Sequence, residues 1–366
     1  MSRKKTGRGR GSPSESFPLE YQQWRLAKWP ARDRAAFLRA IATPNDPFAK
    51  PGPIAGLADR SKAAREKAWG NFLATLAARG RLDPEARPEE RPEERATHEN
   101  ITDWITTLRA RLTANSASRM VVELTSAIKA MVPEKDWRWI RRHPLRPSTA
   151  EARASRKPVE HFDPATLVEG LVAQCAALDQ GPPNRHAAAD FRDAVMVILA
   201  VYVPIRSSNL NALIIGRHLV PMAGTFRLDV PIEETKTGKP VSVILQAEMA
   251  HLLRRYLDRY RPVLIGAGNN TERLWIGIRG EPLKPTATYD IFRKVGRSHG
   301  IALRPHLVRH TAATLLLTRD PTDMGTPSAL LTHKGARTIN EAYDRSGNLG
   351  AIKTWQQLRR KLGRSE

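Results

Sequence analysis

Cysteine, acidic residues and long apolar stretches are all scarce in this chain of 366 residues. The single cysteine, Cys175, excludes an internal disulfide framework, and its apolar neighbours predict a buried packing role. The longest apolar run, Ala194 to Val203, is too short to span a bilayer and predicts a buried helix. The chain begins Met-Ser-Arg-Lys-Lys with no apolar segment behind it, which is not typical of a secretory signal. We therefore expect a cytoplasmic protein with no membrane contact.

Basic residues outnumber acidic ones by 60 to 37, which gives the chain a formal net charge of +23. This excess is larger than solubility requires and indicates a polyanionic partner. A merely basic protein, such as one associated with ribosomes, would share this composition, so charge alone does not choose between them. Hydrophobic residues make up 41% of the chain, enough for substantial cores, and the length predicts two domains.

Shifts in composition along the chain predict its organisation. Proline- and arginine-rich segments separate stretches with helical apolar spacing. From N- to C-terminus we expect a disordered basic arm at 1–17, a helical extension at 18–57, a helical domain at 58–142, an extended basic linker at 143–160, a second domain at 161–345 and an amphipathic tail helix at 346–366.

Local signals place helices in the first domain. Thr97 is a good N-cap for a helix that turns Ile101 and Trp104 inward, and a further helix is expected to start at Ser116 or Ser118. Between the helical stretches, the repeat that begins at Arg87 (Arg-Pro-Glu-Glu-Arg-Pro-Glu-Glu-Arg) predicts an exposed loop.

The second domain combines helices with a short run of strands. Asp163-Pro164 predicts the capped start of a helix that continues through Leu178. Apolar residues then alternate over 226–232 and 241–245, on either side of a lysine-bearing turn, which predicts a β-hairpin. Arg217 and His218 are interpreted as the solvated end of a helix. The fold class is therefore mainly α with a small antiparallel sheet.

Several side chains of the C-terminal half have the chemistry needed to cleave a phosphodiester without a metal. That reaction needs a nucleophile, cations that hold the non-bridging oxygens, and an acid that protonates the leaving oxygen. Arginine suits the second task because its planar fork bonds two oxygens and stays charged. The candidates, in chain order, are Arg206, Lys236, His306, Arg309, His333 and Tyr343.

This ordered set resembles the tyrosine recombinase (phage integrase) family over about residues 160 to 345, and the helical segment before it resembles that family's core-binding domain. The resemblance implies that Tyr343 attacks phosphorus to form a 3′-phosphotyrosyl link. Arg206 and Arg309 would clamp the scissile phosphate, and Lys236 would protonate the leaving 5′-oxygen. His306 would act as base or hydrogen-bond donor.

The resemblance further implies that His333 binds a phosphate oxygen, and that neither a cofactor nor a metal is needed. Its expected partners are double-stranded DNA, three further copies in a tetramer joined by exchange of C-terminal tails, and accessory DNA-bending or directionality factors. The expected function is a site-specific DNA recombinase, an integrase or transposase of a mobile element, located at the nucleoid. Two alternatives stay open. One is a DNA-binding regulator with weak or no catalysis on the same scaffold, and the other is an enzyme like the type IB topoisomerases.

The chain departs from the family pattern in three places. Asn209 stands where an acidic residue is usual, and it could still hydrogen-bond an arginine or histidine. Thr332 replaces a glycine before His333, and the interval from His333 to Tyr343 is one residue longer than is common.

Other residues compete with some of these candidates. His310 is expected to be a structural histidine, although a zinc site with His306 is conceivable from their spacing. Lys239 could replace Lys236 as the acid. Tyr260 and Tyr289 are rival nucleophiles only in principle, since helical patterns surround both.

Overall fold

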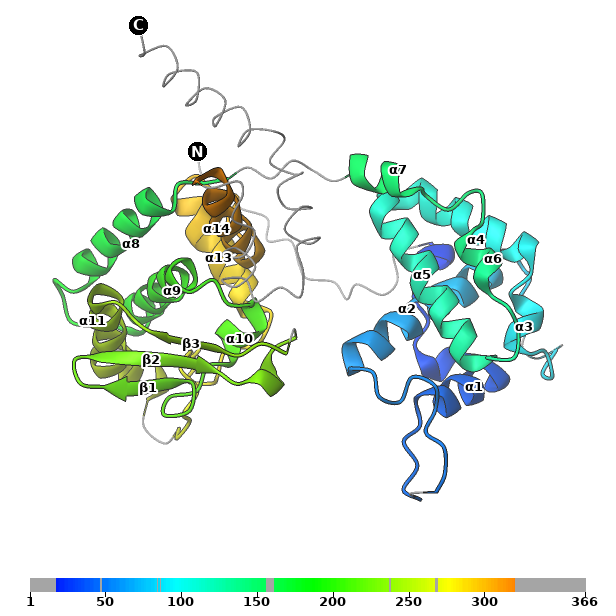
Figure 1. Cartoon of the computed structure of the whole chain (residues 1–366), viewed down its shortest axis with the longest axis horizontal. Coiled ribbons are helices and arrows are strands. Elements are labelled where there is room, and N and C mark those ends of the chain that lie inside the picture. The colour runs from blue at the N-terminus through cyan, green and yellow to red at the C-terminus, as the bar shows by residue number, and fades with distance from the viewer. Residues whose placement is uncertain are drawn as a thin grey trace, which may run out of the picture. The chain divides into compact units, whose positions relative to one another are not determined.

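The computed structural model describes residues 18–319, except for 47, 84, 86, 156–160, 237, 267 and 268. The chain divides into two compact units, Met1–Lys157 and Pro158–Glu366 (Figure 1). The expected basic arm at 1–17 and tail helix at 346–366 lie outside the described residues.

The N-terminal unit is helical throughout its described part (Figure 1). Two caps explain where its central helices begin, because Thr97 accepts a hydrogen bond from the Asn100 N–H and Thr113 accepts one from the Ser116 N–H. The helix capped by Thr113 therefore starts at Ala114, ahead of the serines expected to begin it. The elements are 3-10 turns at Leu19–Tyr21 and Leu26–Lys28, α1 (Ala31–Ile41), α2 (Asp59–Ala78), α3 (Pro92–Arg95), α4 (His98–Arg111), α5 (Ala114–Met131), α6 (Arg138–Arg141) and α7 (Thr149–Ala154).

Aromatic side chains fill the core of this unit. Trp69 and Trp104 are fully buried, and their indole N–H groups are satisfied by Asp33 at 2.9 Å and Asn71 at 3.0 Å. Phe37 of α1 belongs to the same cluster. The extension expected at 18–57 thus shares one core with the helical domain expected at 58–142.

The arginine-rich repeat ends inside this core. Its last residues form α3, and Arg95 is only 1% exposed, with its guanidinium 2.9 Å from the Asp33 carboxylate. The prediction of an exposed loop was therefore wrong for Arg95. The reason is tertiary, because a buried carboxylate from α1 supplies the counter-charge that the local sequence does not show.

The segment expected as an extended linker also contains regular structure. Ser148 and Glu151 form a capping box at the start of α7, and Glu151 accepts a hydrogen bond from Arg109 of α4 at 2.8 Å. The linker is therefore not extended at 149–154, where α7 contacts α5 of the N-terminal unit.

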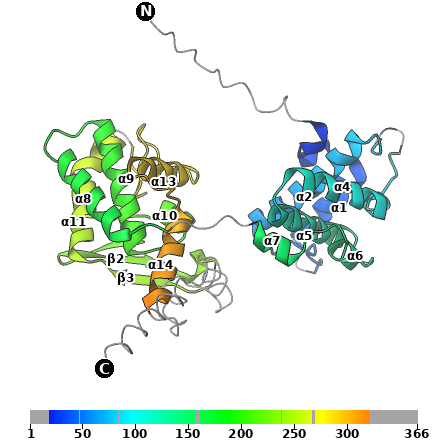
Figure 2. The ribbon, with the colours of Figure 1, turned by 90° about the horizontal axis from the view of Figure 1, so that it is seen from above.

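The C-terminal unit combines helices with a small antiparallel sheet, which confirms the predicted fold class (Figures 1 and 2). Asp163 caps the helix that begins at Pro164, as the sequence predicts. The elements are α8 (Pro164–Leu178), α9 (Arg185–Tyr202), α10 (Ser207–Ala212), β1 (Leu219–Met222), β2 (Thr225–Val230), a 3-10 turn at Ile232–Glu234, β3 (Val241–Ile244), α11 (Ala247–Arg255), a π-helical turn at Tyr256–Tyr260, α12 (Arg261–Ile265), α13 (Ala287–Ser298) and α14 (Pro305–Arg319).

The sheet has the order β1-β2-β3, with Leu219 opposite Leu228 and Val230 opposite Val241. The predicted hairpin corresponds to β2 and β3, but β1 was not predicted. It joins β2 through a two-residue turn in which Gly224 has a φ of 76°, a conformation that glycine adopts without strain.

The core of this unit surrounds α9, whose central residues are buried on every side. Cys175 of α8 is buried against it, as expected, and burial raises the pKa of its thiol to about 12. Among the described residues, no helix has both the length and the apolar character to cross a bilayer.

Candidate active site

Two of the predicted catalytic arginines meet in one hollow of the C-terminal unit. Arg206 is the N-cap residue of α10, and Arg309 lies on the second turn of α14. The hollow is lined by both arginines together with Asn209, Thr235 and three apolar side chains, Ile205, Val230 and Val241. Residues far apart in the sequence are thus brought together by α10, the β2–β3 hairpin and α14.

The electrostatics of this hollow favour an anion. Burial, and then the nearby charge of Arg206, lower the pKa of Arg309 to about 10, and burial also lowers the pKa of Arg206. Two guanidinium groups that are partly stripped of water and repel each other gain free energy when an oxyanion lies between them. Phosphate fits because each guanidinium can bond two of its oxygens.

Hydrogen bonds fix Arg309 relative to Arg206. Nη1 of Arg309 donates to the backbone carbonyl of Pro204, two residues before Arg206. Farther along α14, Thr311 lies 3.2 Å from Nδ1 of His161, which follows the expected linker. The helix that carries Arg309 is therefore fixed both to the loop before α10 and to the start of the unit.

Lys236 lies on the turn that borders this hollow. The lysine is exposed and follows Thr235, whose side chain lines the hollow. The turn is closed by the Lys239 N–H, which donates to Oγ1 of Thr235 at 3.1 Å. Lys236 and Lys239 both belong to this turn, so the choice between them as the acid stays a prediction.

Asn209 has a role that the sequence did not indicate. Its Nδ2 donates to the backbone carbonyl of Glu234 at 3.1 Å, so it joins α10 to the hairpin. The sequence indicated only that Asn209 could bond an arginine or a histidine.

The interpretation of His218 as part of a solvated helix end was wrong. His218 is 2% exposed, and its Nε2 lies 3.0 Å from Oε2 of Glu234. Its neighbour Arg217 is exposed and pairs with the same carboxylate. The residues lead directly into β1, and the Ala223-Gly224 turn after that strand was the signal that could have revealed it.

His306 and His310 lie one turn apart on α14. Their ring centroids are 4.6 Å apart at an interplanar angle of 70°, with His306 exposed and His310 half-buried. In the described part of the chain, no group of three or more His, Cys, Asp or Glu residues is placed to hold a metal.

The structure separates the two rival nucleophiles. Tyr260 is fully buried and donates to Oδ1 of Asp179 at 2.7 Å, and burial with this bond raises the pKa of its phenol to about 12. It therefore cannot reach a phosphodiester. Tyr289 is 47% exposed on α13. His333 and Tyr343, with Thr332 before them, lie outside the described residues, so their roles stay predictions.

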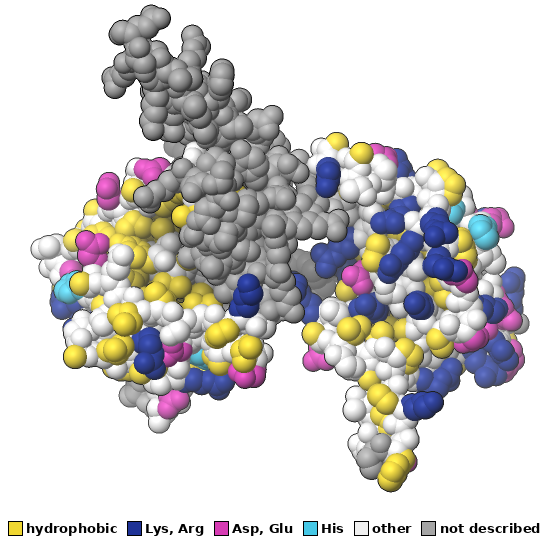
Figure 3. All heavy atoms as spheres, viewed as in Figure 1, with side chains coloured by type: hydrophobic (Ala, Val, Ile, Leu, Met, Phe, Trp, Pro, Cys, Tyr) yellow, Lys and Arg dark blue, Asp and Glu magenta, His cyan; other side chains and the backbone are white. Residues whose placement is uncertain are grey.

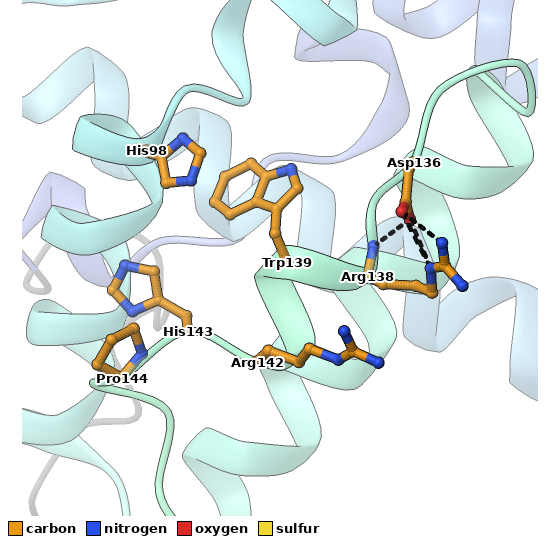
Figure 4. A pocket seen from close by; sticks show the side chains of 7 residues that line it. All are labelled: His98, Asp136, Arg138, Trp139, Arg142, His143 and Pro144. Carbon is orange, nitrogen blue, oxygen red and sulfur yellow. Dashed lines mark hydrogen bonds and ion pairs between the residues drawn. The ribbon is translucent and has the colours of Figure 1, made fainter.

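The N-terminal unit has a second hollow, of about 320 Å³, around Trp139 (Figure 4). His98 stacks on the indole with a centroid distance of 4.0 Å. Arg138 is held in place by Asp136, whose carboxylate accepts from its guanidinium at 2.8–3.0 Å, and Arg142 follows the same helix (Figure 4). The hollow therefore combines an aromatic wall with two guanidinium groups.

His143 at this hollow is oriented by two hydrogen bonds. Its Nδ1 accepts from the Leu145 N–H at 3.2 Å, so the proton of the neutral ring resides on Nε2, which lies 3.0 Å from Oγ1 of Thr102. Burial, and then the nearby His98, lower the pKa of His143. A neutral, structural role fits this histidine better than that of a phosphate-binding cation.

The C-terminal unit is thus a mainly helical domain that places two arginines in one hollow beside a lysine-bearing hairpin. Residues 171–347 match the sequence profile of the phage integrase family. Over this unit, the chain is therefore similar to the phage integrase family, the tyrosine recombinases.

One characterised recombinase is similar to part of this chain. The tyrosine recombinase XerA of Saccharolobus solfataricus is 31% identical over 109 residues, which are 30% of this chain and 32% of that recombinase. The matched segment thus spans about a third of the relative's length.

Two solved structures share the fold. One is the XerH site-specific recombinase bound to palindromic difH substrate in a post-cleavage complex, with a TM-score of 0.55, 15% identity, and coverage of 92% of this chain and 100% of that one. The other is XerH bound to difH substrate in a pre-cleavage complex, with a TM-score of 0.52, 14% identity, and coverage of 78% and 76%.

Proposed function

We propose that this chain is a site-specific DNA recombinase that cuts and rejoins DNA through a 3′-phosphotyrosyl intermediate. The observation that carries the proposal is the hollow in which Arg206 and Arg309 repel each other beside the turn of Lys236. The match of residues 171–347 to the phage integrase family supports it, as does the similarity to the XerA recombinase.

The arginines stabilise the charge that builds on the phosphate. In the cleavage step the phenol oxygen of Tyr343 forms a bond to phosphorus while the bond from phosphorus to the 5′-oxygen breaks. Arg206 and Arg309 bind the non-bridging oxygens, and His333 adds a further hydrogen bond to one of them. Donors fixed in place before the reaction stabilise a transition state without reorganisation.

Two proton transfers complete the step. The phenol proton passes to His306, and the ammonium of Lys236 gives a proton to the departing 5′-oxygen, leaving a 5′-hydroxyl. The phosphotyrosyl bond conserves the energy of the broken ester, so the 5′-hydroxyl of a second duplex can attack it and reseal the strand. The sequence of steps needs neither a nucleotide cofactor nor a metal.

The N-terminal unit supplies a second DNA contact in this proposal. Many lysine and arginine side chains lie on its face shown in Figure 3. The hollow at Trp139 places Arg138 and Arg142 beside an aromatic wall, a combination that suits the sugar-phosphate backbone. Affinity for DNA should therefore fall steeply as the salt concentration rises.

A covalent trap tests the proposal. A DNA substrate with a nick beside the cleavage site loses its 5′-hydroxyl fragment by diffusion, so the protein stays attached to the 3′-phosphate. We expect a covalent adduct with the native chain and none with Tyr343→Phe, while Tyr289→Phe, which alters the exposed rival, should form the adduct normally. An adduct that survives Tyr343→Phe would refute the nucleophile, and its absence from the native chain would refute cleavage.

Finer features of the function extend this proposal. We propose that the enzyme acts as a tetramer joined by C-terminal tails, serves the integration or transposition of a mobile element, and works at the nucleoid in the cytoplasm with accessory DNA-bending factors. A chain that binds DNA with normal salt dependence but forms no adduct would instead be the regulator considered above. The observation that favours this alternative is Asn209, which bonds a backbone carbonyl at a position where the family usually has an acidic side chain.

A further inference from the structure

The hollow that contains Arg206 and Arg309 is called the arginine hollow below. The buried side chain of His218 connects two segments that border it. The backbone N–H of Ile214, which follows α10, donates to Nδ1 of His218 at 3.1 Å. That nitrogen therefore carries no proton, and the proton of the neutral ring lies on Nε2. Nε2 is 3.0 Å from Oε2 of Glu234, so His218 donates to the carboxylate that ends the 3-10 turn after β2.

A second connection closes a ring of contacts. Nδ2 of Asn209, in the middle of α10, donates to the backbone carbonyl of the same Glu234 at 3.1 Å. One connection thus runs through the Glu234 side chain and the other through its backbone. Together they join α10, which Arg206 caps, to the turn that carries Lys236 two residues later.

The burial of His218 makes its bond to Glu234 more important than the exposed contacts of the same carboxylate. The imidazole is 2% exposed, whereas Arg217, which pairs with the same carboxylate, is exposed at the surface. A buried donor left without its acceptor carries a desolvation cost, so the Glu234 carboxylate is held where His218 can reach it. An exposed ion pair such as that of Arg217 contributes much less.

We propose that His218 and Glu234 are positioning residues for the lysine turn, which hold Lys236 in register with the phosphate clamped by Arg206 and Arg309. This inference rests on the proposed function. It assigns the pair no contact with DNA. The predicted consequence is selective: loss of the His218–Glu234 bond impairs protonation of the leaving oxygen while the arginine clamp stays intact.

Two substitutions at His218 separate its two hydrogen bonds. The amide nitrogen of His218→Gln can occupy the place of Nε2 and still donate to Glu234. The amide oxygen of His218→Asn can occupy the place of Nδ1 and still accept from Ile214, but the shorter side chain does not reach Glu234. Glu234→Ala breaks the pair from the other side, and Glu233→Ala, on the same exposed turn, is the control for loss of one carboxylate.

A DNA substrate with sulfur in place of the bridging 5′-oxygen tests whether a variant is slow because the leaving group is not protonated. When sulfur replaces the bridging 5′-oxygen, the leaving group departs as a thiolate and needs no proton, because thiols are far stronger acids than alcohols. A variant that has lost only the placement of its acid is therefore rescued by this substrate. Lys236→Ala supplies the reference for a lost acid, and Arg309→Met the reference for a lost clamp.

We expect His218→Asn and Glu234→Ala to slow single-turnover cleavage of the ordinary substrate by about 10²-fold, the size of effect that a misplacement of about 1 Å can cause. With the sulfur-bridged substrate their rates should return to within a few fold of the native rate, as should that of Lys236→Ala. His218→Gln and Glu233→Ala should cleave both substrates normally. Arg309→Met should be slow with both.

Other outcomes would overturn the inference in distinct ways. Equal slowing of His218→Asn and Glu234→Ala on both substrates would show a general structural role, and native rates on the ordinary substrate would show no role. In both cases the native chain still cleaves, so the proposed function stands. If the native chain cleaves neither substrate, the proposed function falls, and this inference with it. Far-ultraviolet circular dichroism and a urea unfolding curve for each variant show that the proteins compared are folded.

Discussion

The two units of this chain bury arginine in opposite electrostatic settings. In the N-terminal unit, Arg95 is 1% exposed and lies 2.9 Å from the carboxylate of Asp33. In the C-terminal unit, Arg309 is 6% exposed, donates to the neutral carbonyl of Pro204, and has its pKa lowered by burial and by the charge of Arg206. One arginine is matched by a carboxylate, and the other is placed against a second cation.

We interpret the difference as one between a structural arginine and an arginine that is proposed to bind an anion. Arg192 supports the distinction within the C-terminal unit itself, since it is also buried but pairs with Asp193 at 2.6 Å. A fold that can pair one buried arginine internally has no stability reason to place another beside a like charge. The proximity of the two charges, which together with burial lowers the pKa of Arg309, is the feature on which the proposed anion site rests.

The largest effect should follow removal of the clamp. Arg309→Met eliminates one oxyanion donor, and losses of this kind lower rates by about 10²–10³-fold. We expect at least that reduction in covalent adduct formation, measured in single turnover at saturating DNA. Arg259→Met, which alters an arginine bonded to the Gly181 carbonyl elsewhere in the unit, should retain normal cleavage. If Arg309→Met cleaves normally, the arginine is structural and the contrast with Arg95 disappears.

A matched pair of variants compares the stability of the two settings. Arg95→Met leaves the Asp33 carboxylate buried without its cation, which should lower the free energy of unfolding by about 3–5 kcal/mol. Arg309→Met removes a repelled charge, so its free energy of unfolding should stay within about 1 kcal/mol of the native value or exceed it. Urea unfolding of both variants at pH 8 checks this, and equal losses would contradict the comparison.

The stability loss caused by Arg95→Met should also depend on pH. Burial raises the pKa of Asp33 to about 6, although Arg95 and the indole of Trp69 oppose the rise. Because the folded-state pKa lies above the unfolded one, the contribution of this group to stability is greatest below about pH 4 and falls as the pH rises through about 6. Arg95→Met should therefore lose less stability at pH 5, where Asp33 can take up a proton, than at pH 8.

An oxyanion should stabilise the C-terminal unit by binding between Arg206 and Arg309. Inorganic phosphate at ten times its dissociation constant should raise the free energy of unfolding by about 1.4 kcal/mol through linkage. Calorimetry in phosphate and in chloride of equal ionic strength measures the shift. Arg206→Met and Arg309→Met should remove it, whereas Arg95→Met should keep it. A shift that persists in all three variants would be a general salt effect.

The sequence predicted those features that neighbouring residues determine. Asp163-Pro164 marked a helix that ends at Leu178, as predicted, and the alternation around the Lys236 turn located β2 and β3. The pairing of Arg206 with Arg309 was predicted only from the order of residues that the family shares. Local pattern carries no information on which of the chain's many arginines will meet.

The features that were missed depend on tertiary contacts. Arg95 lies in a charged, proline-rich repeat, and only the carboxylate of Asp33 explains its burial. His218 precedes β1, whose four residues include Pro221 and lack clear alternation, so the strand and its buried histidine were not predicted. By contrast, the start of α7 had a local signal in the capping box of Ser148 and Glu151, which the prolines around it obscured.

The smallest expected effect concerns a surface carboxylate of the N-terminal unit, Glu151, which also pairs with groups of its own unit. Glu151 accepts from the backbone N–H of Ser148 and from Arg109, and these bonds lower its pKa to about 2. Because the folded-state pKa of Glu151 lies below the unfolded one, the contribution of Glu151 to stability is present above about pH 4.5 and is lost as the pH falls through about 2.

Ser148→Ala should lower the free energy of unfolding by about 1 kcal/mol, as the loss of an N-cap does. Hydrogen exchange should show faster exchange of the α7 amides in this variant and unchanged exchange in α9 of the other unit. If the α7 amides exchange at the same rate in the variant, the cap formed by Ser148 and Glu151 does not stabilise this helix.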